Sequence, residues 1–335
     1  GKTLTSKSYE LDFREGPTIT AALTTETDVT GAMKLACNVA PPRSFNGQML
    51  GHKGFLLTET QRDEILKSDR KSRAVIFPYL NGREFLSGKG RPDRYVLDFD
   101  RLDQLEAAAY PGAFEWVRKR ILPDRQRKAI EGKDAEGKMR PHHKAFLSRW
   151  WQLSFGRPEL LGILRELPRY LVCSLVTKRP VFIFVDSRIR PSNLLQIFAL
   201  SDDYSFGIMQ SRPHWEWFKA KSSKLTERYR FGENIWNTFP WPQSPTKKQI
   251  DAIANAGCLI RKVRADALQK MKGDLRALYR NLELPGQNPL KGAHTQLDKA
   301  VLSAYGCSPT DDLLAQVLSL NFRVGSKIET PQPIT

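Results

Sequence analysis

Cysteine and long apolar runs are both scarce in this chain of 335 residues. None of its four cysteines is paired in a Cys-x-x-Cys pattern or set beside histidine at metal-ligand spacing, so we predict no metal site and reduced thiols in the core. They are Cys37, Cys173, Cys258 and Cys307. No run of about 18 apolar residues occurs, and residues 1–30 lack the apolar segment of a signal peptide. We therefore expect a cytoplasmic protein with no membrane contact.

Acidic residues are outnumbered by basic ones. The chain has 53 Lys and Arg against 36 Asp and Glu, a formal net charge of +17, and a pI near 9.8. Folding does not require such an excess, and it favours polyanions as partners because Lys and Arg release the counterions that surround nucleic acid. The alternative is a basic protein with no nucleic-acid partner.

A pattern of strands is clear between Phe77 and Phe99. The apolar run that ends at Phe77 is interrupted by Pro78, and the segment 94–99 alternates polar and apolar residues with a period of two. Two strands are predicted here, joined by a loop that contains Asn81-Gly82 and the basic, glycine-rich segment 87–92.

Further along, segments 171–176 and 181–185 predict a hairpin with a basic tip, and segment 194–200 predicts a strand that pairs with it. Capping boxes at Thr58 and Thr246 predict two helix starts, and apolar residues after 246 recur at helical spacing. The predicted fold class is α+β, a β-rich mixed domain with flanking helices followed by a small helical C-terminal subdomain.

The amino-acid sequence of these segments resembles a known signature. Residues 77–85 read FPYLNGREF and residues 94–99 read RYVLDF. They resemble the specificity region of large adenine-specific DNA methyltransferases, including fused type II restriction-modification enzymes and related phage-defence methyltransferases. Four more blocks follow the family's order and extend the resemblance over roughly Tyr9 to Tyr305: Phe45–Gln48 with Gly54–Thr58, Trp150-Trp151, Phe206–Arg212 with His214-Trp215, and Arg228–Arg230 with Asn237–Pro242.

The resemblance implies a division into parts. Residues 1–40 correspond to the tail of the methyltransferase domain or a linker, 41–243 to the DNA target-recognition domain, 244–328 to a helical subdomain and 329–335 to a disordered tail. The implied function is sequence-specific recognition of double-stranded DNA for an S-adenosylmethionine-dependent adenine-N6 methyltransferase in restriction-modification or phage defence. The implied partners are duplex DNA and the chain's own N-terminal methyltransferase domain.

Catalytic and cofactor motifs are absent from the sequence. No Asp/Asn-Pro-Pro-Tyr/Phe tetrapeptide, cofactor-binding glycine turn or nuclease motif occurs, so the catalytic domain is expected upstream and S-adenosylmethionine is expected there rather than on this chain. His214 lacks a nucleophile or carboxylate in a recognisable pattern, and we predict that it is structural. Two alternatives remain: a scaffold or RNA- or protein-interaction module of a defence complex, and a free-standing enzyme.

Candidate DNA contacts are basic residues in predicted loops, in the basic run 118–149 and at strand ends. We predict that one group contacts phosphates: Lys89, Arg91, Arg94, Arg118, Arg120, Arg125, Arg127, Lys221, Lys224, Arg228 and Arg230. We predict that a second group, at strand ends where long donors can enter a groove, reads base edges: Lys178, Arg179, Arg188 and Arg190. The alternative for both groups is a solvated surface.

Overall fold

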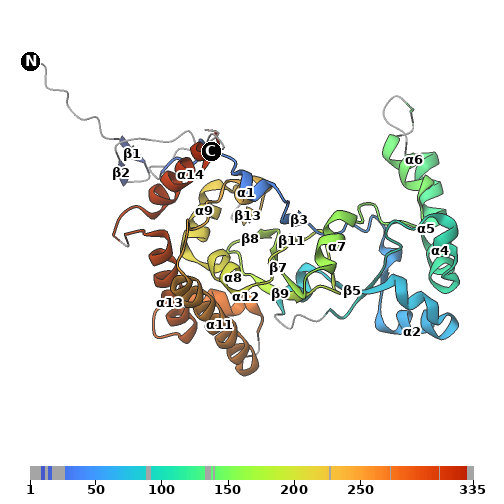
Figure 1. The fold of residues 1–335 in the computed structure, drawn as a ribbon. Coiled ribbons are helices and arrows are strands. Elements are labelled where there is room, and N and C mark those ends of the chain that lie inside the picture. Colours follow the sequence, from blue (N-terminus) through green and yellow to red (C-terminus); the bar gives the residue numbers. More distant parts are fainter. Residues whose placement is uncertain are drawn as a thin grey trace, which may run out of the picture.

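A computed structural model describes most of the chain. Its described residues are 9–11, 14–16, 27–87, 92–132, 137–138, 140–225, 228–271, 273–308 and 310–329. They form two lobes (Figure 1). The small lobe comprises residues 49–78 and 94–155, and the large lobe comprises the other described residues from 27 onward. Mixed sheets and helices confirm the predicted α+β class.

The small lobe packs helices against a short sheet. The sheet has the order β10 (Arg190–Pro191), β5 (Ile76–Leu80), β6 (Tyr95–Leu97) and β4 (Leu56–Leu57), and its edge strand β10 comes from the large lobe, into which the end of β5 also runs. The helices are α2 (Glu59–Ser68), α4 (Gln104–Ala108), α5 (Pro111–Glu131) and α6 (Pro141–Ser148), with 3-10 turns at Lys53–Phe55 and Arg70–Val75. Trp150 and Trp151 lie in this lobe's core.

Local signals explain where several of these elements begin. Thr58 forms the predicted capping box with Gln61 and starts α2. The two strands predicted around Pro78 are β5 and β6.

Asn81, predicted to lie in a loop, instead caps the short helix α3 (Gly82–Leu86), because its side chain accepts hydrogen bonds from two backbone N–H groups of that helix. Helix α5 continues to Glu131, and Ala129 is buried within it.

The large lobe contains an antiparallel sheet that is buried on both faces. Its order is β3 (Ser44–Asn46), β11 (Leu195–Phe198), β7 (Arg169–Ser174) and β9 (Ile183–Asp186), which confirms the predicted pairing of β11 with the hairpin. Side chains alternate between faces, so Tyr170 and Val172 pack beside helix α7 (Pro158–Arg165) while Leu171 and Cys173 face the main core.

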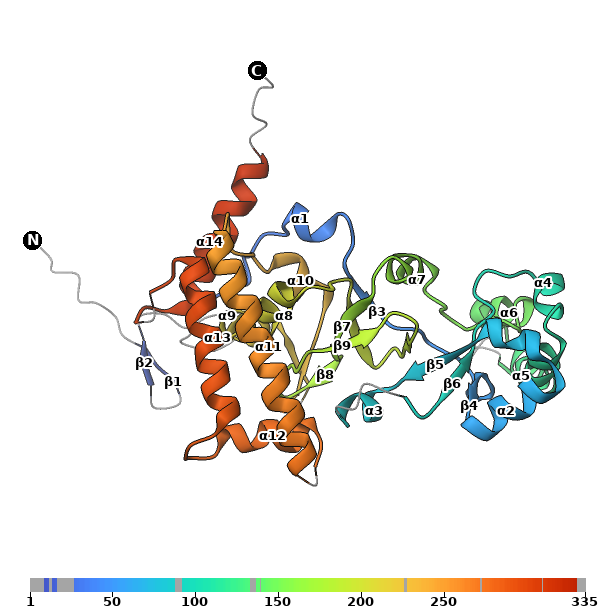
Figure 2. The same cartoon turned by 60° about the horizontal axis from the view of Figure 1, so that its bottom comes forward.

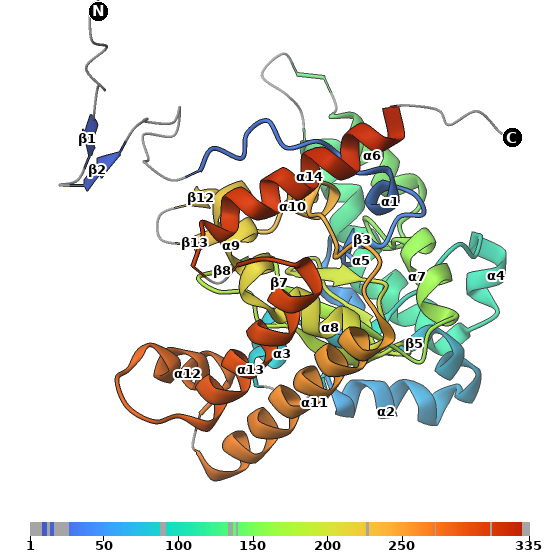
Figure 3. The ribbon, with the colours of Figure 1, turned by 60° about the vertical axis from the view of Figure 1, so that its left-hand side comes forward.

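Helices cover the other side of this sheet. They are α1 (Ala36–Val39), α8 (Asp203–Gln210), α9 (Arg212–Lys221), α10 (Glu233–Thr238), α11 (Lys247–Lys270), α12 (Leu275–Arg280), α13 (Pro289–Tyr305) and α14 (Leu313–Glu329), with a 3-10 turn at Asn281–Glu283. Figure 3 shows α14 crossing α9. Phe198 and Trp217 share one hydrophobic cluster with Ile253 and Leu297, so residues on both sides of position 243 build the same core. The domain boundary at that position stays a prediction.

The remaining described segments bear on a few expectations. Strands β1 (Tyr9–Leu11) and β2 (Arg14–Gly16) form an antiparallel pair, and residues 330–335 of the predicted tail lie outside the described residues. Cys173 is buried, but Cys37 and Cys258 are exposed, so the prediction of core thiols is wrong for those two. Within the described part of the chain, no helix has the length and apolar character that a membrane span needs.

Candidate nucleic-acid interface

A small third sheet brings together two basic segments that lie far apart in the sequence. Strand β8 (Val176–Thr177) pairs with β13 (Arg228–Arg230), which pairs in turn with β12 (Ser223–Leu225). Directly after β7 the chain changes its hydrogen-bond partner. The backbone N–H of Phe231, which follows β13, donates to the carbonyl of Leu175. The predicted basic hairpin tip therefore lies beside Arg228 and Arg230.

The tip itself is fixed by a local turn. The Thr177 hydroxyl donates to the carbonyl of Arg179 at 2.6 Å and accepts from its N–H at 3.2 Å. A threonine hydroxyl that closes such a turn holds the next two residues in one conformation. Lys178 is exposed at the tip, and Arg179 is half-buried.

A hollow of about 470 Å³ opens between this tip, β13, α3 and α12. Figure 2 shows α3 and α12 on the same side of the large lobe as β8. Phe85, Leu86, Val181 and Tyr279 supply its apolar and aromatic lining. Five cationic side chains also line it, and no carboxylate is found among the described residues around it: Lys178, Arg179, Arg228, Arg276 and Arg280. We call this feature the cationic hollow.

The electrostatics of the cationic hollow favour an anionic ligand. Cations gathered around one concavity raise its positive potential, and low-dielectric walls focus that field toward the opening. The Arg179 guanidinium lies 5.5 Å from the ring centroid of Tyr279 and 5.9 Å from that of Trp215, so two aromatic faces stabilise its charge. A phosphate or a base edge that entered here would meet several donors at once.

Comparison with known proteins places this region in context. Residues 178–243, which include the hairpin tip and β13, match the family model described as the target recognition domain of MmeI. This match confirms the resemblance. The fold is similar to that in the structure of the type IIL restriction-modification enzyme MmeI in complex with DNA, with a TM-score of 0.70 over 94% of this chain at 23% identity.

A curated relative matches in sequence as well. DNA methyltransferase A of Bacillus subtilis (strain 168) is 34% identical over 115 residues, which is 34% of this chain and 12% of that protein. The chain likewise covers 39% of the MmeI chain, so it spans well under half the length of either relative.

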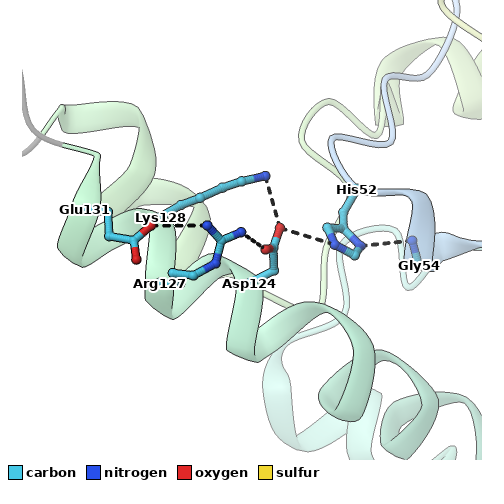
Figure 4. A network of polar contacts seen from close by, with 6 residues as sticks. All are labelled: His52, Gly54, Asp124, Arg127, Lys128 and Glu131. Carbon is cyan, nitrogen blue, oxygen red and sulfur yellow. Dashed lines mark hydrogen bonds and ion pairs between the residues drawn. The ribbon is translucent and has the colours of Figure 1, made fainter.

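Several cations in the small lobe, where much of the basic run 118–149 lies, are neutralised by neighbours (Figure 4). Arg127 pairs with Asp124 and, at 3.1 Å, with Glu131, while Lys128 lies 3.0 Å from Asp124. Hydrogen bonds from Arg127 and Lys128 lower the pKa of Asp124 to about 2. His52 lies 3.4 Å from the same carboxylate. This part of the run is therefore less positive than its composition predicted.

Other predicted phosphate contacts are found in different settings. Arg118 is exposed and pairs with Glu115 at 2.9 Å, and the exposed guanidinium of Arg120 lies 3.3 Å from the centroid of the Trp116 ring. Lys221 donates to the carbonyl of Val29 at 2.9 Å and is half-buried. Exposed positions are also found for Arg94, Arg228 and Arg230. Outside the described residues or side chains lie Lys89, Arg91 and Lys224.

Arg125 is a correction to the sequence prediction. Its side chain is 6% exposed and donates to the carbonyls of Phe146 at 2.7 Å, Arg149 at 3.2 Å and Gln152 at 3.1 Å. It cannot contact a phosphate in this arrangement, since its donors are directed into the lobe. Its position within a basic run predicted a surface residue, and only the packing of α6 against α5 buries it.

Arg190 is the second correction, in the group predicted to read bases. It is 6% exposed in β10, its Nε lies 3.8 Å from Asp98, and its guanidinium lies 4.0 Å from the Phe77 ring centroid. It joins the lobes instead of facing a groove. Arg188, in contrast, is exposed and bonds to both carboxylate oxygens of Asp186, at 2.8 and 2.6 Å. The prediction for Arg188 stays a prediction.

Sequence reasoning missed the part of the cationic hollow that comes from α3 and α12. Arg276 and Arg280 are four residues apart and so lie on one face of α12, with Tyr279 beside them. That spacing was visible in the sequence, but nothing there indicated that the helix would face the hairpin tip. His214, in line with the prediction of a structural role, is buried among Phe182, Phe231 and Phe239.

Proposed function

We propose that this chain recognises a specific sequence of double-stranded DNA on behalf of a DNA methyltransferase of the restriction-modification or phage-defence type. The observation that carries the proposal is the cationic hollow, which lies at the hairpin tip where the match to a target recognition domain begins. We assign Lys178 and Arg179 to the reading of base edges, because both lie on the tight turn at the hairpin tip and long donors on such a tip can enter a groove.

The surrounding cations are proposed to grip the backbone. Arg228, Arg276 and Arg280 come from two separate elements around the tip, and together they can bind phosphates on either side of a groove that the tip enters. Contacts of this kind set position and orientation, whereas the tip supplies discrimination between sequences.

The chemistry itself is proposed to belong to another domain. We propose that an upstream methyltransferase domain binds S-adenosylmethionine and methylates adenine at N6, while this chain holds the duplex. A flipped base must be taken out of the stack, and flipping requires that the flanking duplex be held from outside the catalytic pocket.

The test is duplex binding at increasing salt concentration. If Arg228, Arg276 and Arg280 each neutralise a phosphate, the slope of log K against log salt is expected to be at least about 2.7 in magnitude. Arg276→Gln with Arg280→Gln should reduce the magnitude by about 2, and Lys67→Gln, an exposed charge on α2, serves as the matched control. Duplex recognition would be refuted by an affinity that does not change with salt concentration. It would also be refuted if RNA or single-stranded DNA competed successfully against the duplex.

A further inference from the structure

A buried cation lies beneath the hairpin tip. Arg264, in the middle of α11, is 4% exposed, and its hydrogen-bond partners in the described part of the chain include no carboxylate. Its three nitrogens bond instead to neutral groups: the carbonyl of Phe182 at 2.7 Å, the side-chain oxygen of Gln210 at 2.5 Å and the hydroxyl of Tyr279 at 2.7 Å. Burying a charge is costly, so a retained buried arginine calls for a specific role.

Gln210 completes the attachment of the hairpin to the helices. Its side-chain oxygen, which accepts from Arg264, also accepts the backbone N–H of Phe182 at 2.9 Å. Phe182 lies three residues after Arg179. Its backbone N–H is thus bonded to Gln210 of α8 and its carbonyl to Arg264 of α11. The Thr177 hydroxyl holds the other side of the tip. Little freedom is left for the two basic residues between these attachments.

Tyr279 links this network to the cationic hollow. Its hydroxyl contacts Arg264 and lies 3.0 Å from Nε2 of His294, while its ring lies beneath the Arg179 guanidinium. Burial, with Arg264 and Arg179 nearby, lowers the pKa of His294 to about 3, so this histidine is neutral at neutral pH. The network therefore adds no second buried cation next to Arg264.

We infer that Arg264, Gln210 and Tyr279 are positioning residues that fix Lys178 and Arg179 in the orientation required for sequence discrimination. The inference rests on the proposed function and extends it to the C-terminal helices. A planar guanidinium fork can orient several acceptors at once, which an apolar side chain of the same volume cannot do. The helices then contribute to the choice of sequence without touching a base.

The experiment measures discrimination separately from binding. The preferred site is first selected by the full chain from a pool of random duplexes, and dissociation constants for that site and a scrambled duplex are then compared over a range of salt. Gln210→Met removes the acceptor and is expected to reduce the ratio of the two constants roughly tenfold or more, with the salt slope unchanged. Gln210→Glu keeps an acceptor for Arg264 and for the N–H of Phe182, loses only the long bond that the Gln210 amide donates to the carbonyl of Pro180 at 3.5 Å, and should retain most of the ratio.

Tyr305→Phe is the matched control, because it also removes one hydroxyl hydrogen bond in the helical part, to the carbonyl of Pro240 at 2.9 Å, away from the tip. It should leave the ratio unchanged. A folded Gln210→Met variant with the parental ratio, or a Gln210→Glu variant as impaired as Gln210→Met, would overturn the inference. If Gln210→Met does not fold, Tyr279→Phe is judged by the same ratio. A parent chain without duplex binding or site preference would instead refute the proposed function.

Discussion

Single arginines in this protein have opposite roles that their sequence context does not distinguish. Arg125 and Arg127 are two residues apart on α5, yet Arg125 joins three backbone carbonyls inside the small lobe and Arg127 pairs with carboxylates at the surface. Exposed pairs contribute little to stability, whereas removing the donor of a buried group leaves its acceptors unsatisfied.

Arg125→Met should therefore lower the free energy of unfolding by about 2–4 kcal/mol, since three carbonyls lose a buried donor. Arg127→Gln is the control and should change it by about 0.5 kcal/mol or less. Urea denaturation followed by tryptophan fluorescence measures both, because Trp150 and Trp151 lie in the same lobe. Equal effects of the two substitutions would contradict the structural role of Arg125.

Asp298 provides a prediction of pH dependence. Burial raises its pKa to about 6, although it accepts the backbone N–H of Arg212 at 2.7 Å. The folded protein then binds more protons than the unfolded chain between pH about 4 and 6, so the free energy of unfolding falls as pH rises through this window. Asp298→Asn keeps an acceptor and should raise stability at pH 7.5 by about 1–2 kcal/mol. A difference in melting temperature between parent and variant that stays constant from pH 4 to 7.5 would refute this.

At the scale of elements, two helices approach each other closely through glycine. A Cβ at Gly207 of α8 would lie 2.5 Å from Cγ2 of Ile253 and 3.0 Å from its carbonyl oxygen in α11, and a Cβ at Gly257 would lie 3.0 Å from Phe206. These contacts place α8, which carries Gln210, against α11, which carries Arg264. The close packing of the two helices therefore supports the network under the hairpin tip.

Gly207→Ala should destabilise the protein by about 1–3 kcal/mol because the added methyl group meets backbone and a β-branched side chain. Gly162→Ala in α7 is the matched control: nothing lies within 4 Å of the added Cβ, so helix propensity should stabilise by about 0.5–1 kcal/mol. Thermal melts of the two variants measure the difference. A Gly207→Ala variant as stable as the parent would show that α8 and α11 separate at little cost.

At the scale of the whole molecule, a buried polar cluster connects the lobes. The side-chain nitrogen of Gln48 donates to Asp98 and to the carbonyl of Gly156, both at 2.7 Å, and Arg190 lies beside the same carboxylate. Burial raises the pKa of Asp98, which Arg190 opposes. Strand β10 pairs in parallel with β5 at this junction, so the cluster fixes the strand that runs between lobes.

Arg190→Met and Asp98→Asn should each cost about 3–5 kcal/mol, because either change leaves a buried group without its partner. The double variant should cost clearly less than the sum, since no unpaired charge then remains. A double-mutant cycle by urea denaturation measures the coupling. Additive losses would mean that Asp98 and Arg190 do not stabilise each other.

The sequence by itself determined the elements that depend on local patterns. Alternation of period two predicted β6, and short apolar runs predicted β5, β7 and β11. The capping boxes at Thr58 and Thr246 predicted the starts of α2 and α11, and the ordered motifs indicated the resemblance that was later confirmed. Such signals lie within a few residues of one another, so no knowledge of distant segments is needed to read them.

Only the tertiary structure decided which basic side chains face a ligand. Arg125 and Arg190 are buried by carbonyls and a carboxylate far away in the sequence, and Arg276 and Arg280 join Lys178 and Arg179 only because α12 packs beside the hairpin. Lysine and arginine are expected at the surface by default, and what overrides this is a set of long-range partners. Those partners are brought together by packing, which local sequence patterns do not encode.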